Sequence, residues 1–412
     1  MGGRTITEPA REVDVIHETG VLVVGSGPSG LAAALAAARA GAEVTLLERF
    51  GCFGGNLTAV GVEGLAWYRH ERTVEAGGLA REFEQRAIAS GVAIPDSQSR
   101  SHEIDAEGFK LVARRVIDAT GDADVAARAG APTVTTPVEQ MQAASVIFHL
   151  SGVDKRAFLA GVRADPQTYA DWSSGEWAVQ TTGKEDELFS PFLRAPFQRA
   201  ARDGLIDAEL QTLAGTWGAV HDSGELTYLN VVHLAACDGT DPDSLTRFEI
   251  EGRRQAAAAT DAMRRYTPGC AGARLRNFGM TIGIRDTRKL DAVYNLADAD
   301  VRGEGRFEDS VGIYPEFIDG YGVLVLPTTG RYMQIPYRSM LPRGVRRLLV
   351  AGRAIGGDRI AHAATRNMAC CIVTGQAAGI AAAVSLDAGR ELRELALEPV
   401  FSELERQGVR RL

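Results

Sequence analysis

Three glycines at positions 25, 27 and 30 carry the clearest chemical signal in this sequence, because they follow an apolar run at Val21–Val24 and precede an Ala/Leu-rich segment. Gly25 allows a tight turn, Gly27 lets a pyrophosphate approach the backbone, and Gly30 lets the following helix pack closely on the strand. The first N–H groups of that helix lack intrahelical partners and favour an anion. Glu48 closes a second apolar run, where its carboxylate can accept hydrogen bonds from ribose hydroxyls. These residues predict a dinucleotide-binding site.

The elements that must position this site can be read from the same pattern. Val21–Val24 and Val44–Leu47 are expected to be parallel strands joined by the helix between them. Arg115–Asp122 is typical of a buried strand that ends at a glycine turn, and Arg346–Ala351 is typical of another. Because the last strand lies far along the chain, we predict an α/β fold. Its Rossmann-like dinucleotide domain is discontinuous and carries an inserted α+β substrate domain.

The predicted domain boundaries follow from this order of elements. The dinucleotide domain takes residues 17–140 and 336–388, and the inserted domain takes residues 141–335. The inserted domain is expected to contain a long helix at Ser244–Tyr266 and to carry the surface that faces the substrate. A C-terminal helix lies within residues 389–412.

One connection does not fit a complete Rossmann sheet. Such a sheet needs a third parallel strand soon after the second crossover, yet Asp105–Ala113 is typical of a helix that runs directly into the strand at Val116–Ala119. Either the sheet lacks a strand, or a segment is missing between Val112 and Arg115. We favour the second interpretation, which predicts consecutive Cα atoms there farther apart than the usual spacing of about 3.8 Å.

Composition excludes several classes of function. The chain has 412 residues, 45% hydrophobic and 24% charged, as in a soluble globular protein. Its net charge of −8 argues against a nucleic-acid partner. No apolar stretch is long enough to span a membrane, and residues 1–16 lack the apolar core of a secretory signal. The five cysteines include no CxxC pair, so we expect no disulfide framework and no metal site, and a cytoplasmic protein fits best.

Six separated motifs resemble the FAD-dependent oxidoreductase family within the glutathione-reductase-like flavoproteins. The relation extends more distantly to the flavoproteins of succinate dehydrogenase and fumarate reductase. The motifs are GSGPSG with Glu48, FGCFGGNLT, IDATGDADVAARAGAP at 117–132, IGIRDTRKL at 282–290, IPYRSMLPRGVRRLLVAGRAI at 335–355 and HAATRNMACCIVTGQAAG at 362–379. The sequence departs from the family at Ala113–Arg115, where relatives carry a strand and a β-meander.

The resemblance implies that FAD is the cofactor, with its pyrophosphate on the glycine loop, a ribose on Glu48 and its flavin side along Gly54–Asn56. A helix that starts at Thr374 would lie beneath the isoalloxazine ring. Thr374 would cap this helix, Gly375 would permit close approach, and the free N–H groups would stabilise the negative charge of reduced flavin. The alternative is an ordinary packing helix. The complete set of predicted FAD contacts is Gly25, Gly27, Pro28, Ser29, Gly30, Glu48, Arg49, Gly54, Gly55, Asn56, Ala119, Thr120, Gly121, Asp122, Gly352, Arg353, Gly375, Gln376, Ala377 and Ala378.

The predicted catalytic residues are His362, Arg366 and Arg285. His362 and Arg366 are four residues apart and share a face if this stretch is helical. The resemblance places this pair near the flavin, and the ordinary pKa of His362 suits proton transfer; a structural histidine bonded to backbone is the alternative. Arg285 and Arg288 form a second cationic site that can bind a substrate carboxylate or carbonyl, unless they pair structurally with neighbouring aspartates.

No second GxGxxG unit is present, so the sequence encodes no separate NAD(P) domain of the disulfide-reductase type. Electrons are therefore expected to pass between a substrate, FAD and an unknown acceptor. The expected function is that of a dehydrogenase, which transfers a hydride between a small organic substrate and flavin N5. The alternatives are a flavoprotein subunit of an electron-transfer complex and a non-redox dinucleotide-binding module. A homo-oligomer or a hetero-oligomer is compatible with this function.

Overall fold

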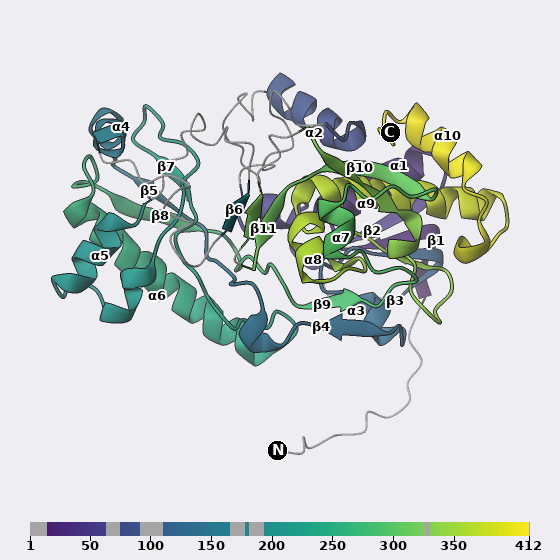
Figure 1. Cartoon of the computed structure of the whole chain (residues 1–412), viewed down its shortest axis with the longest axis horizontal. Helices are drawn as coiled ribbons and strands as arrows, with labels where there is room; N and C mark the ends of the chain where they lie inside the picture. Colours follow the sequence, from purple (N-terminus) through teal and green to yellow (C-terminus); the bar gives the residue numbers. More distant parts are fainter. Residues whose placement is uncertain are drawn as a thin grey trace, which may run out of the picture.

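The computed structural model describes residues 15–62, 75–90, 110–164, 178–180, 193–321, 323–325 and 330–411. Two lobes lie side by side (Figure 1). One lobe contains both the first and the last described segments, and the other contains only segments from the middle of the chain (Figure 1). The N-terminal part of the sequence therefore folds together with the C-terminal part.

A parallel sheet forms the centre of the first lobe. Its four strands are β1 (Val15–Val24), β2 (Val44–Leu47), β3 (Lys110–Asp118) and β14 (Leu348–Val350). All neighbouring pairs are parallel, and the order across the sheet is β14-β3-β1-β2. This arrangement confirms the predicted α/β class, with strands from both ends of the chain in one sheet.

Two helices bury one face of this sheet. They are α1 (Pro28–Arg39) and α9 (Met368–Asp387). Val21, Val23 and Ile117 are fully buried in one cluster with alanines of both helices. Contrary to the sequence expectation, α9 is long and apolar enough to cross a membrane, the one such helix among the described residues, but 89% of its apolar window is buried inside the protein. Its place in this core accounts for its hydrophobic composition.

Helices α1 and α9 approach each other closely because two glycines lie at their contact. A Cβ atom at Gly375 would overlap the carbonyl group of Ser29, and a Cβ atom at Gly379 would overlap that of Ala33. Only glycine permits this separation of the two backbones. At Gly375 and Gly379, α9 is therefore a packing helix, which was the alternative to a helix that starts beneath the flavin.

The sequence interpretation of the connection before β3 was wrong in two respects. Residues 110–113 form the start of β3 rather than a helix, while the preceding residues of that prediction lie outside the described ranges. Ala113 pairs with Thr19 and Arg115 pairs with Val21, so the strand passes through Val112–Arg115 without the predicted break. Short apolar runs do not distinguish a strand from a helix, and here pairing with β1 decides.

The interpretation that the sheet lacks a strand fits this sheet better than a missing segment between Val112 and Arg115. In a classic Rossmann order the third strand lies beyond β2, whereas β3 lies on the other side of β1. Within the described residues no strand pairs with the outer edge of β2, and Leu47 at its end is 36% exposed. The described sheet therefore lacks the strand that would cover β2.

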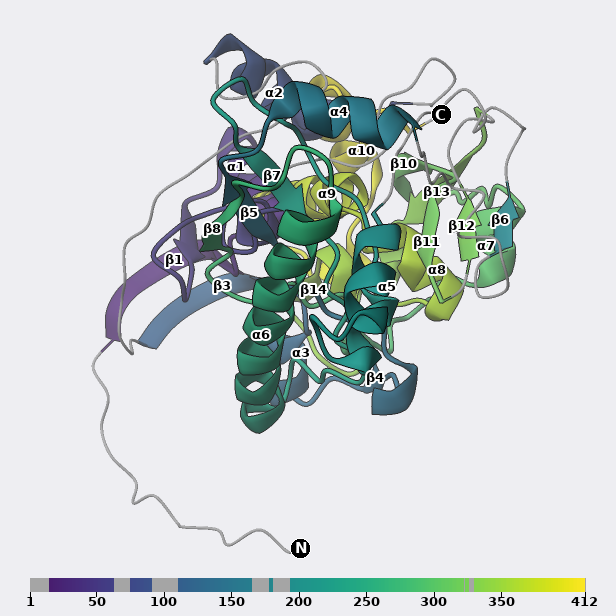
Figure 2. The same cartoon turned by 90° about the vertical axis from the view of Figure 1, so that its left-hand side faces the viewer.

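The second lobe is an antiparallel sheet covered by helices. Its strands are β5 (Phe148–Ser151), β7 (Leu226–Leu229) and β8 (Arg274–Phe278), in the order β7-β5-β8. Its helices are α4 (Lys155–Ala164), α5 (Ala195–Arg202) and α6 (Pro242–Tyr266). Helix α6 begins where the side chain of Asp241 accepts hydrogen bonds from Asp243 and Ser244, and it runs along the lobe beside α5 (Figure 2).

The remaining elements connect the lobes or cover the first one. The strands are β4 (Thr133–Thr135), β6 (Ala178–Gln180), β9 (Arg288–Leu290), β10 (Ser310–Pro315), β11 (Ile318–Gly320), β12 (Val323–Val325) and β13 (Tyr332–Pro336). The helices are α2 (Gly78–Ala89), α3 (Asp124–Arg128), α7 (Asp298–Arg302), α8 (Arg359–Thr365) and α10 (Glu398–Arg406), and the short helical turns used below are η1 (Gly55–Leu57), η5 (Ala208–Thr212) and η7 (Gly352–Ala354).

The buried clusters divide the chain differently from the predicted boundary at residue 335. The core of the second lobe draws on residues between Ala144 and Ile282. Residues between Leu296 and Leu341, including Tyr314 of β10, are buried in the core of the first lobe instead. The segment between Leu296 and Leu341 thus packs against the parallel-sheet lobe through β10 and β13, while β12 pairs with β6 of the inserted segment. The predicted domain boundaries stay predictions.

Candidate cofactor and active site

The three glycines after β1 have different structural reasons to be glycine. Gly25 has φ of +95°, and a Cβ there would lie 2.5 Å from the carbonyl oxygen of Ala119. A Cβ at Gly30 would overlap the carbonyl group of Gly25. At Gly27 a Cβ would meet no atom within 4 Å, so no described part of the protein requires a glycine there. The open space at Gly27 is what a ligand's approach to the backbone requires.

The start of α1 is ready to receive an anion. Gly27 is its N-cap residue, Pro28 occupies the first helical position, and no side chain caps the helix. The first N–H groups of a helix have no intrahelical partner, and the helix dipole makes this end positive. These features fit the pyrophosphate of a dinucleotide.

A second glycine pair lies over this loop. Gly54 has φ of +114° and its N–H donates to the carbonyl oxygen of Ser26 at 2.9 Å. A Cβ at Gly55 would lie 2.8 Å from Cα of Gly27. Asn56 follows in η1, so the predicted Gly54–Asn56 segment directly borders the α1 cradle.

Glu48 holds the end of β2 against the same loop. Its carboxylate accepts hydrogen bonds from the N–H and the hydroxyl of Ser26, at 2.7 and 2.6 Å. Its other oxygen accepts the N–H groups of Arg49 and Phe50, at 2.7 and 2.9 Å. The carboxylate is therefore oriented beside the cradle, and a ribose hydroxyl would replace the Ser26 hydroxyl as its donor. The Arg49 side chain is exposed and lies over the Phe50 ring.

The turn after β3 borders the cradle from the other side. Ala119 donates its N–H to the carbonyl oxygen of Val24, which fixes the turn next to Gly25. Buried Asp118 accepts the N–H and the hydroxyl of Thr120, at 3.1 and 2.7 Å. Burial raises the pKa of Asp118, and the hydrogen bonds to its carboxylate oppose that effect. The turn is thus built by side-chain hydrogen bonds before any ligand binds.

Arg353 of η7 closes over this turn. Its guanidinium lies against Gly121, where φ is +89°, and donates to Asp122 at 2.5 Å. Asp122 also accepts the hydroxyl of Thr287. The Nε atom of Arg353 is buried and has no hydrogen-bond partner in the described structure. A buried N–H donor of this kind fits an anionic or polar group of a bound cofactor.

Three distant segments meet at Ser29. A Cβ at Gly352, which has φ of +82°, would lie 2.6 Å from the Ser29 hydroxyl oxygen. The N–H of Gly352 donates to the hydroxyl oxygen of Thr374 at 3.0 Å, and Gly375 packs on the Ser29 backbone. These segments pack tightly against one another at Ser29, whereas a Cβ at Gly27 would meet no atom within 4 Å. The open face at Gly27 is therefore where a dinucleotide cofactor fits.

The predicted helix start at Thr374 was wrong. Helix α9 begins at Met368 with Asn367 as its N-cap residue, so Thr374 and Gly375–Ala378 lie inside the helix. Gln376 accepts the N–H of Leu79 in α2 at 2.9 Å, and its own amide donates to the side chain of Gln407. The free N–H groups that suit the negative charge of reduced flavin lie at Met368 and the residues just after it.

His362 lies in α8 and is only 2% exposed. Its Nδ1 atom is 3.1 Å from the carbonyl oxygen of Arg353, and its Nε2 atom is 3.0 Å from that of Arg285. Burial and the nearby charge of Lys289 lower the pKa of His362 to about 3, so the ring is neutral at pH 7. Both ring nitrogens face backbone carbonyls, which favours the structural alternative over proton transfer.

Arg285 and Arg366 are the two guanidinium groups between the lobes that the sequence marked as catalytic. Arg285 donates to the carbonyl oxygen of Ala143 and, at 3.2 Å, to the side chain of Asn230. Arg366 donates to Asp319 at 2.8 Å. Burial lowers the pKa of Arg285, and the charge of Arg366 lowers it further. Both residues contact His362, because its Nε2 atom lies 3.0 Å from the carbonyl oxygen of Arg285 and its own carbonyl oxygen accepts the N–H of Arg366.

Arg288 forms a structural ion pair with an aspartate, which was the alternative to substrate binding. Its guanidinium donates to the carbonyl oxygen of Asp122 and, at 2.6 Å, to the carboxylate of Asp124. Lys289, next along β9, is buried and pairs at 2.6 Å with Asp286, which also accepts the hydroxyl of Thr136. The segment after residue 285, which leads out of the inserted lobe, is therefore held by hydrogen bonds and ion pairs beside the turn after β3.

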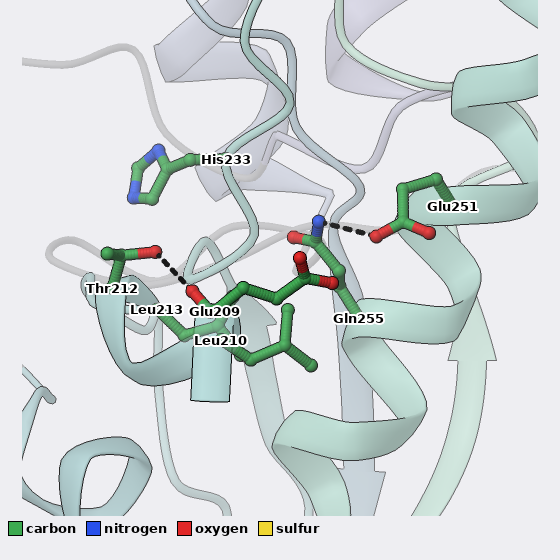
Figure 3. A pocket seen from close by; sticks show the side chains of 7 residues that line it. All are labelled: Glu209, Leu210, Thr212, Leu213, His233, Glu251 and Gln255. Atoms are coloured by element: carbon green, nitrogen blue, oxygen red, sulfur yellow. Dashed lines mark hydrogen bonds between the residues drawn. The ribbon is translucent and has the colours of Figure 1, made fainter. Parts of the chain in front are cut away.

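A hollow of about 240 Å³ lies in the second lobe (Figure 3). His233 is on one side of it, and Glu251, which accepts a hydrogen bond from Gln255, is on the other (Figure 3). The Nε2 atom of His233 lies 2.8 Å from the carbonyl oxygen of Ala214. The lining residues are Glu209, Leu210, Thr212, Leu213, His233, Glu251 and Gln255.

Several polar residues at the boundary of the lobes could not be identified from the sequence. Gln142 and Asp319 are joined by a hydrogen bond from the Gln142 amide to the Asp319 carbonyl oxygen, at 3.4 Å. Tyr314 is fully buried on β10. None of these residues belongs to a spaced motif, and only the fold brings them near Arg366. No group of His, Cys, Asp and Glu in the described ranges is arranged to hold a metal ion, and the five cysteines are buried and free.

The fold and cradle define a dinucleotide-binding protein of the flavoenzyme class. A family model described as "FAD dependent oxidoreductase" matches residues 20–107 and 88–406, so the chain belongs to that family. The protein is therefore an FAD-dependent oxidoreductase, and the alternative of a non-redox binding module is not supported. The comparison with curated proteins found no match.

Solved structures of other flavoenzymes show only a distant likeness. A geranylgeranyl bacteriochlorophyll reductase-like protein from Thermoplasma acidophilum is 13% identical, with a TM-score of 0.40, covering 95% of this chain and 82% of that chain. The p-nitrophenol 4-monooxygenase PnpA from Pseudomonas putida DLL-E4 is also 13% identical, with a TM-score of 0.39, covering 95% and 85%. At these values the neighbours say nothing about the substrate of this chain.

Proposed function

We propose that this oxidoreductase is a dehydrogenase for a small organic anion, whose hydride passes to flavin N5 and whose electrons then go to a separate acceptor. The observation that carries the proposal is the pair Arg285 and Arg366 between the lobes. Among the described residues, the Asp319 carboxylate pairs directly with Arg366, whereas Arg285 donates to two neutral groups, the Ala143 carbonyl oxygen and the Asn230 side chain. The remaining positive charge suits an anionic substrate group, which a guanidinium can hold by two hydrogen bonds.

The chain's own residues bind and orient in this mechanism. FAD, when bound, supplies the two-electron acceptor for the hydride. Arg285 would fix the anionic end of the substrate, and Arg366 would add to the positive field. His362 lies between the carbonyl oxygens of Arg285 and Arg353, and its neutral ring donates its single N–H to one of them, so the side chain packs between the substrate arginine and the cofactor loop. We therefore assign His362 to positioning rather than to proton transfer.

The test is an anaerobic screen that follows flavin absorbance in the FAD-loaded protein. The panel contains small hydroxy and amino acids, together with the methyl ester of each acid as its uncharged partner. We expect one or more acids to reduce the flavin, and their esters to require much higher concentrations. Reduction by the esters as readily as by the acids would contradict the proposed anion site.

Arg285→Ala tests the residue itself. A lost hydrogen bond to a charged group costs about 1.5–3 kcal/mol, and each 1.4 kcal/mol is a factor of ten, so the half-saturating substrate concentration should rise about 10- to 100-fold. Arg276→Ala is the matched control, because Arg276 pairs with Glu225 in the second lobe at 3.1 Å. An unchanged half-saturating concentration in Arg285→Ala would remove Arg285 from substrate binding.

A further inference from the structure

Three buried polar atoms between the lobes have no hydrogen-bond partner in the described part of the chain. They are Oε1 of Gln142, the hydroxyl of Tyr314 and Nε of Arg366. Gln142 is 8% exposed and Tyr314 is fully buried. Buried polar atoms are nearly always paired in folded proteins, so a group of such atoms indicates a ligand that completes them.

All three residues lie near Asp319. The Gln142 amide donates to the Asp319 carbonyl oxygen at 3.4 Å, and Arg366 donates to the Asp319 carboxylate at 2.8 Å. Tyr314 lies on β10, which packs against α9 and directly precedes β11, the strand that carries Asp319. The start of α9 follows directly after Arg366, with Asn367 as its N-cap residue.

The orientation of the Gln142 amide is fixed by its surroundings. Its Nε2 atom must face the Asp319 carbonyl oxygen, because the opposite orientation would bring two oxygens together. The amide also lies where a side chain at residue 320 would be, and Gly320 leaves that space free. Oε1 of Gln142 is therefore held as an unpaired acceptor.

The three atoms have a defined chemical complement. Gln142 Oε1 can only accept a hydrogen bond, and Arg366 Nε can only donate one. Burial keeps the pKa of Tyr314 well above its ordinary value, so its hydroxyl keeps its proton and donates. A ligand that satisfies all three must offer one donor and two acceptors. A carboxylate has no donor, whereas the imide of an isoalloxazine ring has an N3–H between two carbonyl oxygens.

We propose that Gln142, Tyr314 and Arg366 bind the imide edge of the flavin, with Gln142 Oε1 accepting the N3–H. This inference rests on FAD being the cofactor and adds three flavin-positioning residues to the cradle that holds the pyrophosphate. In this site Arg366 donates its Nε–H to a flavin carbonyl oxygen. Its terminal Nη2 atom still donates to Asp319, and its positive charge still attracts the proposed anionic substrate.

The experiment compares the binding of FAD and N3-methyl-FAD to the apoprotein, by titration of flavin fluorescence. N3-methyl-FAD lacks the N3–H donor. We expect it to bind the wild-type protein at least 10-fold more weakly than FAD. In Gln142→Leu, FAD itself should bind more weakly, and the difference between the two flavins should fall to within about twofold.

Two variants serve as controls. Tyr314→Phe removes the hydroxyl but not the Gln142 acceptor, so the difference between the two flavins should persist. Gln140→Leu changes an exposed glutamine two residues away and should leave both affinities unchanged. These measurements read binding alone, and the wild-type comparison needs no variant to fold.

Each outcome decides between the claims. Equal affinity of the wild-type protein for both flavins overturns the imide site while leaving FAD as the cofactor. A difference that persists in Gln142→Leu removes Gln142 from the site. Failure of the wild-type protein to bind FAD at all would overturn the proposed function and the imide site together.

Discussion

Gly27→Ala separates what the fold requires from what the cofactor requires. Gly27 has φ of −59°, which alanine adopts freely, and its Cβ would meet no atom within 4 Å. Alanine is a poorer N-cap than glycine by about 1 kcal/mol, but it also restricts the unfolded chain, which returns about 0.4–1 kcal/mol. The free energy of unfolding of the apoprotein should therefore change by less than about 1 kcal/mol.

The same methyl group should strongly impair FAD binding, because it occupies the space where the pyrophosphate must approach the first N–H groups of α1. Losing one or two hydrogen bonds to a charged group, each worth about 1.5–3 kcal/mol, lowers the affinity by about 10- to 10,000-fold. The assay combines urea unfolding of the apoprotein with titration of FAD by fluorescence.

Gly30→Ala is the matched comparison. Its Cβ would overlap the carbonyl group of Gly25, so the apoprotein should lose about 1–3 kcal/mol or more of stability before FAD is added. Gly27→Ala would refute the reasoning if it destabilised the apoprotein as much as Gly30→Ala does, or if it bound FAD with wild-type affinity.

Three further predictions concern the supports of the site. Arg115→Met removes the bonds from a buried guanidinium to the C-terminal end of α9 and should cost about 2–4 kcal/mol in urea unfolding; a change below about 0.5 kcal/mol would contradict this role. His362, whose pKa is lowered to about 3, should show a neutral imidazole by NMR from pH 8 down to about pH 5, and an imidazolium at pH 7 would contradict the assignment. Ser26→Ala frees one lone pair of Glu48, so FAD affinity should stay within about threefold of wild type or rise, and a tenfold loss by fluorescence titration would show that a ribose does not replace this hydroxyl.

The local parts of the cofactor site could be predicted from the sequence because short-range constraints create them. The turn at Gly25 and the helix contact at Gly30 are set by residues within a few positions of each other, apart from the carbonyl group of Ala119. The Gly352 and Arg353 segment was found through its motif, and the structure places it against Ser29 and Gly121. Gly25, Gly30 and Gly352 must be glycine for steric reasons, so they can be recognised in the sequence.

The parts that the sequence did not reveal depend on tertiary contacts. The start of α9 was placed at Thr374 because Thr and Gly are good helix openings, but the helix begins at Met368, shortly after α8 ends at Thr365. Gln142 and Tyr314 become neighbours of Arg366 only through the packing of β10 and β11. His362 has the residue type of a proton carrier, and its burial between two carbonyl groups is the observation that favours the proposed positioning role.

Titration of the apoprotein with FAD tests the central claim most directly. The account predicts that one FAD binds per chain, with its fluorescence changed by the surrounding protein, and that Gly27→Ala weakens this binding without unfolding the chain. A wild-type apoprotein that is folded but leaves the fluorescence and mobility of added FAD unchanged would contradict the account.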